Sequence, residues 1–216
     1  MDIAIYGTGG LGKEMAFLVD DSINSPENIM FIDDTKNENN FFGYPMYTFE
    51  KFREKFSPED CQIVIALGEP ELRTVLAQKV IASGYSLGNV IAKSAKVSQY
   101  ATIGAGTIIF HNCVIMPHVV IGENVLLQSS VALTHDDHVG NNSVLSHKVT
   151  VGGASDIGKN CFIGMGSTLR DHISIGDSSI VGMGSVVTKS FPGNSVLVGA
   201  PAKLIRQNDN TPVFKK

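Results

Sequence analysis

The sequence predicts an α/β domain at residues 1–86 followed by a parallel β-helix at residues 87–216. Two observations carry this prediction. Segments typical of strands and helices alternate over the first part of the chain. From Ile91 to Val187, every sixth residue is then Ile, Leu or Val without interruption. Strands have a hydrophobic period of two and helices one of about 3.6, so a fixed period of six indicates a repeat in which each hexad is one short strand plus a corner.

The first part of the chain reads as a small Rossmann-like sheet with helices between its strands. The expected strands are Asp2–Tyr6, Ile29–Ile32 and Cys61–Leu67, and the expected helices are Lys13–Asp21 and Glu69–Ser83. Alternation of this kind produces a parallel sheet. Ligands of such sheets bind at the C-terminal ends of the strands. The loops that follow these strands are therefore the expected binding site.

A glycine-rich loop, Gly7–Gly12 (GTGGLG), joins the first strand to the first helix. Such a loop places backbone N–H groups and a helix N-terminus beside an anion. Gly7, Gly9 and Gly12 also meet the dinucleotide spacing, with the acidic Asp33 about twenty residues on. A structural turn and a dinucleotide site stay open as alternatives. We favour a sugar-nucleotide site, because the domain is too short for a full two-halved dinucleotide sheet.

Two further positions of the hexad are restricted. Counting from the aliphatic column, the second residue is often glycine, which we expect to serve the tight corners. The fifth residue is small or β-branched, which would let it share a narrow interior with the aliphatic column. Between Ala101 and Ser185 only Asp137 departs from this fifth column. A carboxylate there is costly unless it is hydrogen-bonded.

Composition narrows the function classes. The formal net charge of −4 and the pI near 5.8 argue against a nucleic-acid-binding protein. We expect no signal peptide and no membrane insertion, because no charged segment precedes an apolar run at the start and no stretch approaches the length of a membrane span. Three cysteines, Cys61, Cys113 and Cys161, are expected as buried thiols in a reducing compartment. We therefore expect a cytoplasmic protein.

The hexads from about Ile91 to Ile205 resemble the hexapeptide-repeat acyltransferases, whose fold is a left-handed parallel β-helix. Three hexads close one triangular coil in that fold, so residues eighteen apart stack. The N-terminal motifs narrow the resemblance: a strand with a GxGG loop, Phe31–Asp34 (FIDD), and Ala66–Gly68 (ALG) with Arg73. The whole chain is similar to the family of sialic acid O-acetyltransferases and bacterial UDP-4-amino-sugar N-acetyltransferases.

The resemblance implies a sugar-nucleotide substrate, acetyl-CoA as co-substrate, and a homotrimer with active sites at subunit interfaces. Matched residue by residue, it implies that Gly9 and Gly10 bind the phosphates and that Asp33, Asp34 and Gly68 lie near the nucleoside. It also implies that Gln128 contacts the acceptor. The residues implied to bind acetyl-CoA are Gly153, Gly199, Ala200 and Lys203. Some members have a histidine where Leu11 stands here, which leaves the identity of the acceptor open.

Acyl transfer needs a base to take the acceptor's proton, and histidine suits this near neutral pH. All six histidines lie in the repeats, and the resemblance implies His135 as the base with Asp136 orienting it. An exposed corner histidine beside a solvated aspartate is the alternative. Asp137 is a second candidate for the orienting carboxylate, or a buried structural acid. Gly153 comes eighteen residues after His135, so it is expected directly above the imidazole.

His147 lies two whole coils after His111, a spacing similar to that of the metal histidines in hexapeptide-repeat carbonic anhydrases. The third histidine of those proteins would stand at Gly152, so we expect no metal. His147 is instead expected to line the acceptor cleft or a subunit interface.

These features favour an acetyl-CoA-dependent N-acetyltransferase acting on a nucleotide-linked amino sugar, for bacterial surface glycans. An O-acetyltransferase acting on a sugar or sialic acid is one alternative. A non-catalytic hexapeptide-repeat assembly protein is another, which the His135–Asp136 pair argues against.

Overall fold

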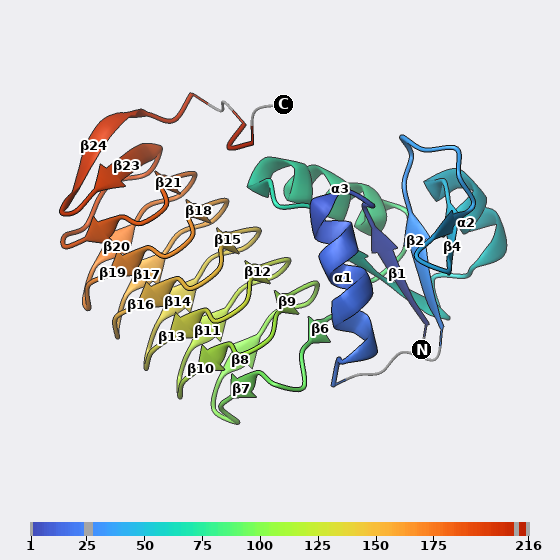
Figure 1. The fold of residues 1–216 in the computed structure, drawn as a ribbon, viewed down its shortest axis with the longest axis horizontal. Helices are drawn as coiled ribbons and strands as arrows, with labels where there is room; N and C mark the ends of the chain where they lie inside the picture. Colours follow the sequence, from blue (N-terminus) through green and yellow to red (C-terminus); the bar gives the residue numbers. More distant parts are fainter. Residues whose placement is uncertain (1, 24–27, 210–211, 215–216) are drawn as a thin grey trace.

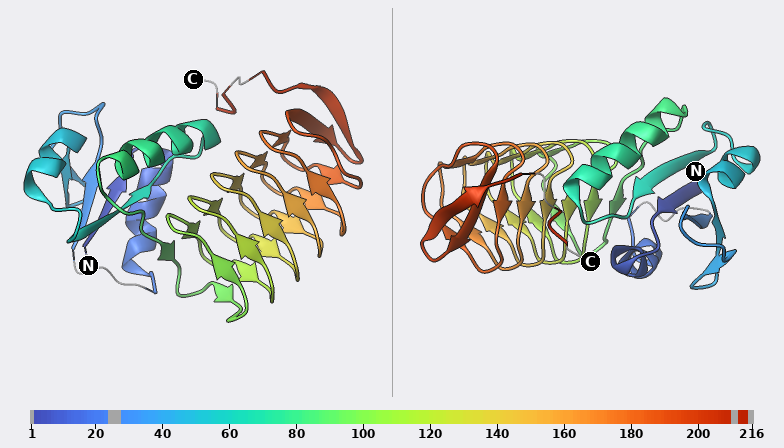
Figure 2. Two further views of the ribbon diagram at one scale, coloured as in Figure 1. Left: turned by 180° about the vertical axis from the view of Figure 1, so that it is seen from behind. Right: turned by 90° about the horizontal axis from the view of Figure 1, so that it is seen from above.

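The computed structural model describes residues 2–23, 28–209 and 212–214, and it joins an α/β domain to a β-helix (Figure 1). The two parts lie side by side, with helices α1 and α3 next to the first coils (Figure 2). The predicted fold class is confirmed, a Rossmann-like domain followed by a left-handed parallel β-helix. The boundary between residues 86 and 87 stays a prediction. Within the described residues, no helix has the length and apolar character needed to cross a membrane.

The α/β domain is a five-stranded sheet in the order β3-β4-β2-β1-β5. Its elements are β1 (Asp2–Tyr6), α1 (Gly10–Asp20), β2 (Ile29–Ile32), β3 (Asn40–Phe41), β4 (Tyr44–Tyr47), α2 (Phe49–Lys55), β5 (Cys61–Ile65) and α3 (Pro70–Ala82). The three expected strands are present and parallel. The sequence did not predict β3, β4 or α2. Thr48 begins α2, because its side chain accepts a hydrogen bond from the Lys51 backbone N–H.

The β-helix consists of two-residue strands that recur every six residues. They are β6 (Val90–Ile91), β7 (Lys96–Val97), β8 (Thr102–Ile103), β9 (Ile108–Ile109), β10 (Val114–Ile115), β11 (Val120–Ile121), β12 (Leu126–Leu127), β13 (Ala132–Leu133), β14 (His138–Val139), β15 (Val144–Leu145), β16 (Thr150–Val151), β17 (Asp156–Ile157), β18 (Phe162–Ile163), β19 (Thr168–Leu169), β20 (Ser174–Ile175), β21 (Ile180–Val181) and β22 (Val186–Val187). From β6 to β19, each strand pairs in parallel with the strand eighteen residues later, as β10 does with β13. Three sheets result, one for each face of the triangular coil.

The interior of the β-helix is filled by the first and fifth columns of the hexad. The aliphatic residues of the first column are buried from Ile109 to Val187. Hydroxyl groups of the fifth column tie neighbouring coils together. Ser143 Oγ accepts a hydrogen bond from the Cys161 N–H at 3.0 Å and donates one to the Gly158 carbonyl at 2.7 Å. The three cysteines are free and buried, as expected.

The expectation that second-column glycines provide the backbone angle of the corner is wrong. The left-handed backbone angle falls on the fourth residue of the hexad, for example at Asn142 (φ 62°) and Asn160 (φ 54°). Asparagine tolerates this conformation better than most side chains. Where the second column holds glycine, the reason is the close approach of the adjacent coil. A Cβ atom on Gly104 would lie 2.5 Å from the backbone carbonyl carbon of Gly122.

One face of the β-helix packs against the α/β domain. The outward residues Ile108, Leu126 and Val144 on this face are buried, and a single hydrophobic core joins the two parts. Arg73 of α3 is fully buried at this boundary. Its guanidinium donates to the Ile65 and Leu67 carbonyls of the α/β domain and to the Asn124 carbonyl and side chain of the β-helix. Arg73 therefore fixes the loop after β5 to a corner of the second part.

An antiparallel hairpin, β23 (Ser195–Gly199) and β24 (Ala202–Gln207), covers the last coil. Such a cap shields the open end of a solenoid. Beyond it, the chain returns to the α/β domain, where the backbone N–H groups of Val213 and Phe214 donate to Glu69 Oε2 at 2.8 and 3.2 Å.

Candidate active site

His135 lies on an exposed corner of the β-helix, between β13 and β14. The next residue, Asp136, has the left-handed angle of the fourth hexad position (φ 62°). Its Oδ2 lies 2.8 Å from His135 Nδ1, and the two side chains are 66% and 57% exposed. A carboxylate at Nδ1 fixes the imidazole orientation and stabilises its protonated form. Nε2 is then the ring nitrogen available to a substrate.

Gly153 lies directly above the His135 imidazole, where the eighteen-residue period places it. A Cβ atom on Gly153 would be 2.7 Å from His135 Cε1 and 2.8 Å from Nε2. Any side chain at this position would therefore displace the ring. The Ala154 N–H also donates to the His135 carbonyl at 2.9 Å, which holds the two turns together.

Asp137 is buried below this corner, with only 1% of its surface exposed. Its Oδ2 accepts from the Thr134 N–H at 2.7 Å and its Oδ1 from the Ser155 N–H at 3.1 Å. Burial raises the pKa of the Asp137 carboxyl to about 6, although these hydrogen bonds and the nearby His135 act in the opposite direction. Of the two carboxylates considered, Asp136 is the one in direct contact with the imidazole.

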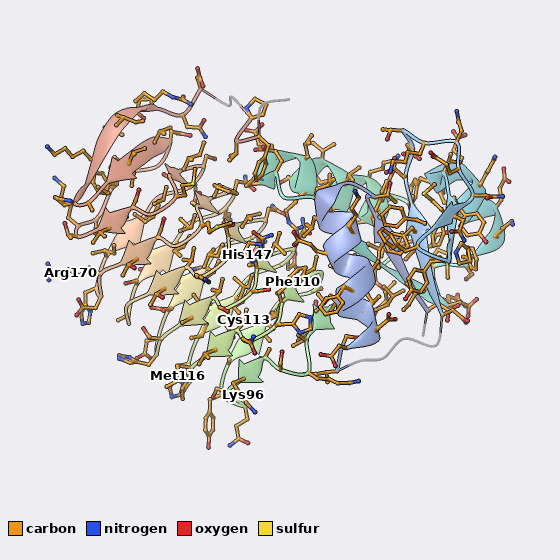
Figure 3. All side chains as sticks on the ribbon, in the orientation of Figure 1. Lys96, Phe110, Cys113, Met116, His147 and Arg170 are labelled. Atoms are coloured by element: carbon orange, nitrogen blue, oxygen red, sulfur yellow. The ribbon has the colours of Figure 1, made fainter. Side chains whose placement is uncertain are left out.

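The His135 corner lies away from the α/β domain of the chain. It joins the two sheets that contain β13 and β14, whereas the sheet that faces the α/β domain contains β12 and β15. Met116 and Arg170 share the column of Thr134, and they lie on the edge opposite α1 and α3 (Figure 3). His147 lies on the side toward the α/β domain (Figure 3). The histidines that cluster in sequence are thus distributed over different corners.

Gln128 lies on the side of the β-helix that faces the α/β domain, away from His135. Its Oε1 accepts from Ser146 Oγ at 2.7 Å, and its Nε2 donates to Glu14 of α1 at 3.4 Å. His111 lies on the same side, with Nδ1 3.2 Å from Ser94 Oγ. In the part of the chain that the structure describes, no three His, Cys, Asp or Glu side chains are grouped closely enough to hold a metal ion.

The glycine-rich loop separates into structural and open positions. Gly7 has a φ of 119° and packs against the Ala66 carbonyl, and Gly12 packs against the Gly7 carbonyl. Gly9 and Gly10 are exposed, and Cβ atoms there would meet nothing within 4 Å. They begin α1, whose first turn has no side-chain cap and no acidic residue. The open backbone N–H groups at this helix start suit a phosphate.

Asp33 and Asp34 both hold the domain together at the C-terminal edge of the sheet. Asp33 accepts hydrogen bonds from the backbone and hydroxyl groups of Thr8 and Thr35. Burial raises its pKa, but these bonds hold the pKa below its ordinary value. Asp34 accepts from Tyr6 Oη and from Lys79 Nζ, the latter at 2.7 Å. Asp33 thereby connects the glycine-rich loop to the end of β2.

Phe214 covers Gly68, the third residue expected near a nucleoside. The ring lies 3.3 Å from the position of a Cβ atom on Gly68, and it makes an edge contact with Phe162 at 5.3 Å. Sequence reasoning gave no indication of this return of the chain. Gly199, Ala200 and Lys203 lie on the terminal hairpin and are exposed.

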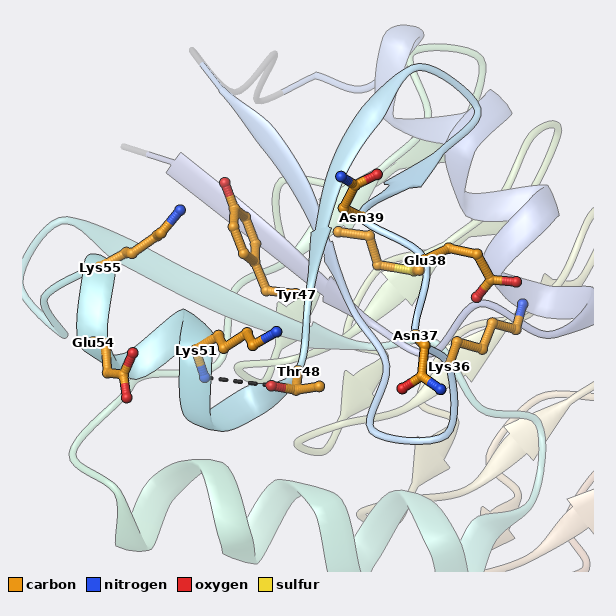
Figure 4. Close-up of a pocket in the computed structure, with 10 residues that line it drawn as sticks. Lys36, Asn37, Glu38, Asn39, Tyr47, Thr48, Lys51, Glu54 and Lys55 are labelled. Atoms are coloured by element: carbon orange, nitrogen blue, oxygen red, sulfur yellow. Dashed lines mark hydrogen bonds between the residues drawn. The ribbon is translucent and has the colours of Figure 1, made fainter.

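A cleft of about 540 Å³ opens beside the Asp33–Asp34 edge, between the segment after β2 and helix α2 (Figure 4). Three lysines and two glutamates are in its lining, together with Tyr47; the charged residues are Lys36, Glu38, Lys51, Glu54 and Lys55. The volume is in the range of small-ligand sites. The sequence did not predict this cleft, because β4 and α2, which form one wall, were not recognised.

Comparisons with known proteins agree with this architecture. The PglD N-terminal domain matches residues 2–80, and the bacterial transferase hexapeptide repeats match residues 100–135 and 154–189. The acetyltransferase domain of PglB from Neisseria gonorrhoeae FA1090 is 27% identical, with a TM-score of 0.89 over 94% of this chain and 99% of that chain. The chain is a hexapeptide-repeat acetyltransferase with a PglD-type N-terminal domain.

Two further solved structures extend the comparison. PerB from Caulobacter crescentus, in complex with CoA and GDP-perosamine, is 25% identical, with a TM-score of 0.85 over 94% of this chain and 97% of that chain. WeeI from Acinetobacter baumannii AYE is 25% identical, with a TM-score of 0.67 over 95% of this chain and all of that chain. No curated protein matches the chain significantly. The acetyltransferase thus shares both of its parts with these structures.

Proposed function

We propose that this acetyltransferase transfers the acetyl group of acetyl-CoA to an amine on a nucleotide-linked sugar. The observation that carries the proposal is the His135–Asp136 pair held against Gly153 on an exposed corner. A similar structure contains CoA and GDP-perosamine, and another contains acetyl-CoA. These relatives support a nucleotide-linked amino sugar as the acceptor and acetyl-CoA as the donor.

The chemistry follows from the free nitrogen of His135. With Asp136 at Nδ1, Nε2 accepts the proton of the acceptor amine as the amine attacks the thioester carbonyl. The bond from nitrogen to the acetyl carbon forms, the bond to sulfur breaks, and CoA leaves as the thiol or thiolate. No covalent enzyme intermediate is required. Because Gly153 has no side chain, the pantetheine arm would pass beside Gly153 and the imidazole. Gly199, Ala200 and Lys203 would lie near the adenine.

The α/β domain would hold the acceptor. The open N–H groups at Gly9 and Gly10 would bind its phosphates. The nucleoside would lie beside Asp33, Asp34 and Gly68, and the cleft after β2 would add room next to Asp33 and Asp34. Gln128, next to α1, would contact the sugar. The repeats have no use for hydride chemistry, so we favour a sugar nucleotide over NAD. A cytoplasmic location is part of the proposal.

A homotrimer would bring the two halves of the reaction together. His135 lies on the corner remote from the α/β domain of its own subunit, so a neighbouring subunit would supply the bound acceptor. The two faces that meet at this corner carry exposed aliphatic side chains, including Val114, Met116 and Val120. Apolar groups of this kind on a regular face favour contact with another protein surface. The active site would then lie between subunits.

An amine acceptor fits this site better than a hydroxyl. A neutral amine attacks a thioester readily and needs one well-placed base, whereas a hydroxyl needs stronger activation. The His135–Asp136 pair supplies one such base at this corner.

The test is incubation with acetyl-CoA and a panel of UDP-, dTDP- and GDP-linked amino sugars, followed by mass spectrometry. The proposal expects one acetyl group on at least one nucleotide sugar and release of CoA. A panel without any acetylated product, in the presence of protein that binds acetyl-CoA, would contradict the proposed acceptor class.

A further inference from the structure

The backbone hydrogen bonds of the β-helix follow one rule with one exception at the His135 corner. From Ser98 to Arg170, the residue in the second position of every hexad except that of Thr134 donates its backbone N–H to a carbonyl of the next coil, at 2.7–3.1 Å. Gly140 donates to Ile157 in this way, and Gly152 to Leu169. The Thr134 N–H instead donates to Asp137 Oδ2 at 2.7 Å. The carbonyl that would have accepted it, Val151 O, accepts from the Thr134 hydroxyl at 2.9 Å.

Asp137 makes this exchange possible because it has one oxygen more than the serines of its column. Ser143 Oγ accepts the amide of Cys161, eighteen residues later. Asp137 Oδ1 makes the equivalent bond to the Ser155 N–H at 3.1 Å. The second oxygen, Oδ2, is then free to hold Thr134. A single buried carboxylate therefore joins the start of the His135 turn to the end of the Gly153 turn.

These bonds surround the candidate base on both sides. Thr134 precedes His135 in the chain, and Ser155 follows the turn whose Gly153 packs on the imidazole. A displacement of either turn would change the position of Nε2 relative to Gly153. The charge of Asp137 is also close enough to His135 for the two to interact electrostatically.

We infer that Asp137 is a positioning residue for acetyl transfer, which acts through the altered Thr134 hydrogen bonds to set His135 relative to Gly153. The inference rests on the proposed role of His135. It assigns no substrate contact to Asp137. Oδ1 accepts the bond from the coil above that a serine hydroxyl accepts elsewhere in the column, and Oδ2 serves the His135 turn.

The experiment replaces Asp137 by the residue that its column uses elsewhere. D137S keeps the bond to Ser155 and removes the bond to Thr134. We expect kcat to fall about 10- to 100-fold, the scale of a misplacement near the reacting atoms. KM for each substrate should change less than about twofold, and Tm should not decrease, because the substitution restores a standard hexad.

The double variant T134G/D137S covers the case in which D137S does not fold, since it reproduces the Gly140–Ser143 pair of the next hexad. It should show the same loss of kcat. S143A is the matched control: it removes a hydroxyl of the same column at another corner, so it should lower Tm and leave kcat unchanged. The resonance of the His135 Cε1 proton, assigned by its absence in H135A, should shift in D137S and not in S143A.

An unchanged kcat in D137S would overturn the inference. A parallel fall of kcat and Tm in both Asp137 variants would also overturn it, because Asp137 would then only stabilise the fold. The H135A variant separates this outcome from a failure of the proposed function. If H135A retains activity, the base assignment is wrong. If H135A is inactive and D137S is fully active, only the role of Asp137 is wrong.

Discussion

Asp137 makes the stability of this protein depend on pH in a direction that can be worked out. Its carboxyl pKa is raised from 3.8 to about 6 in the folded state because it is buried. A raised pKa means that the folded state binds the proton more tightly than the unfolded state. The resulting stabilisation is complete below about pH 3.8 and is lost as the pH rises through about 6. The full difference corresponds to about 3 kcal/mol, since one pKa unit is about 1.4 kcal/mol.

Between pH 5 and pH 8, this linkage predicts a loss of about 1.4 kcal/mol from the Asp137 term alone. D137S has no carboxyl at this position and should not show this loss. From pH 5 to pH 8, its free energy of unfolding should therefore rise by about 1.4 kcal/mol relative to that of the wild type. The assay is urea unfolding of both proteins at pH 5 and pH 8. Both are measured at one fixed protein concentration, because the proposed trimer would make stability depend on concentration. A difference between the two proteins that stays constant from pH 5 to pH 8 would refute the reasoning.

Three further predictions concern the base, the domain boundary and the shared site. H135A should lower kcat by about 10²- to 10⁴-fold with little change in KM for acetyl-CoA, and D136N should have a smaller effect in the same steady-state assay; normal turnover of H135A would reject the base. R73M removes the Arg73 donors from four acceptor atoms at the domain boundary. The free energy of unfolding in urea should therefore fall by about 3 kcal/mol or more. A fall of less than about 1 kcal/mol would contradict this reasoning. G10D places a negative charge at the proposed phosphate site. In the proposed trimer, a G10D subunit still supplies His135 and an H135A subunit still supplies Gly10, so the two variants refolded together should regain activity that neither has alone. No gain of activity would place the whole site within one subunit.

Much of the β-helix could be predicted from the sequence because its repeat is strict. A period of six with no interruption indicates which side chains point inward. The eighteen-residue coil, which the family resemblance implied, then puts Gly153 above His135. The reason for the glycines could not be read in the same way. A pattern shows that a side chain is excluded, but it does not show whether the cause is a backbone angle or a neighbouring coil. Gly104 lacks a side chain because of the neighbouring coil.

The relative placement of the two parts depends on contacts between distant residues. Arg73 meets Asn124, fifty-one residues later, through carbonyl groups that carry no sequence signal. Phe214 meets Gly68 across an even longer separation. The strand Tyr44–Tyr47 contains Pro45 and is short, so its pattern resembled a loop.

The corner itself was predicted in part. The family resemblance implied the pairing of His135 with Asp136, and the structure has this contact at 2.8 Å. The exchange of hydrogen bonds at Thr134 depends on a carboxylate that reaches back three residues, which no hexad pattern specifies. Asp137 was recognisable only as the one charged residue in a column of small ones.

The central claim is acetyl transfer to a sugar amine with His135 as the base. The most direct measurement compares two nucleotide sugars that differ only in a 4-amino or a 4-hydroxy group, each incubated with acetyl-CoA and either the wild type or H135A. We predict a monoacetylated product from the amino sugar with the wild type, and at least about a 100-fold slower reaction with H135A. Acetylation of the hydroxy sugar alone, or equal rates for the two proteins, would contradict this claim.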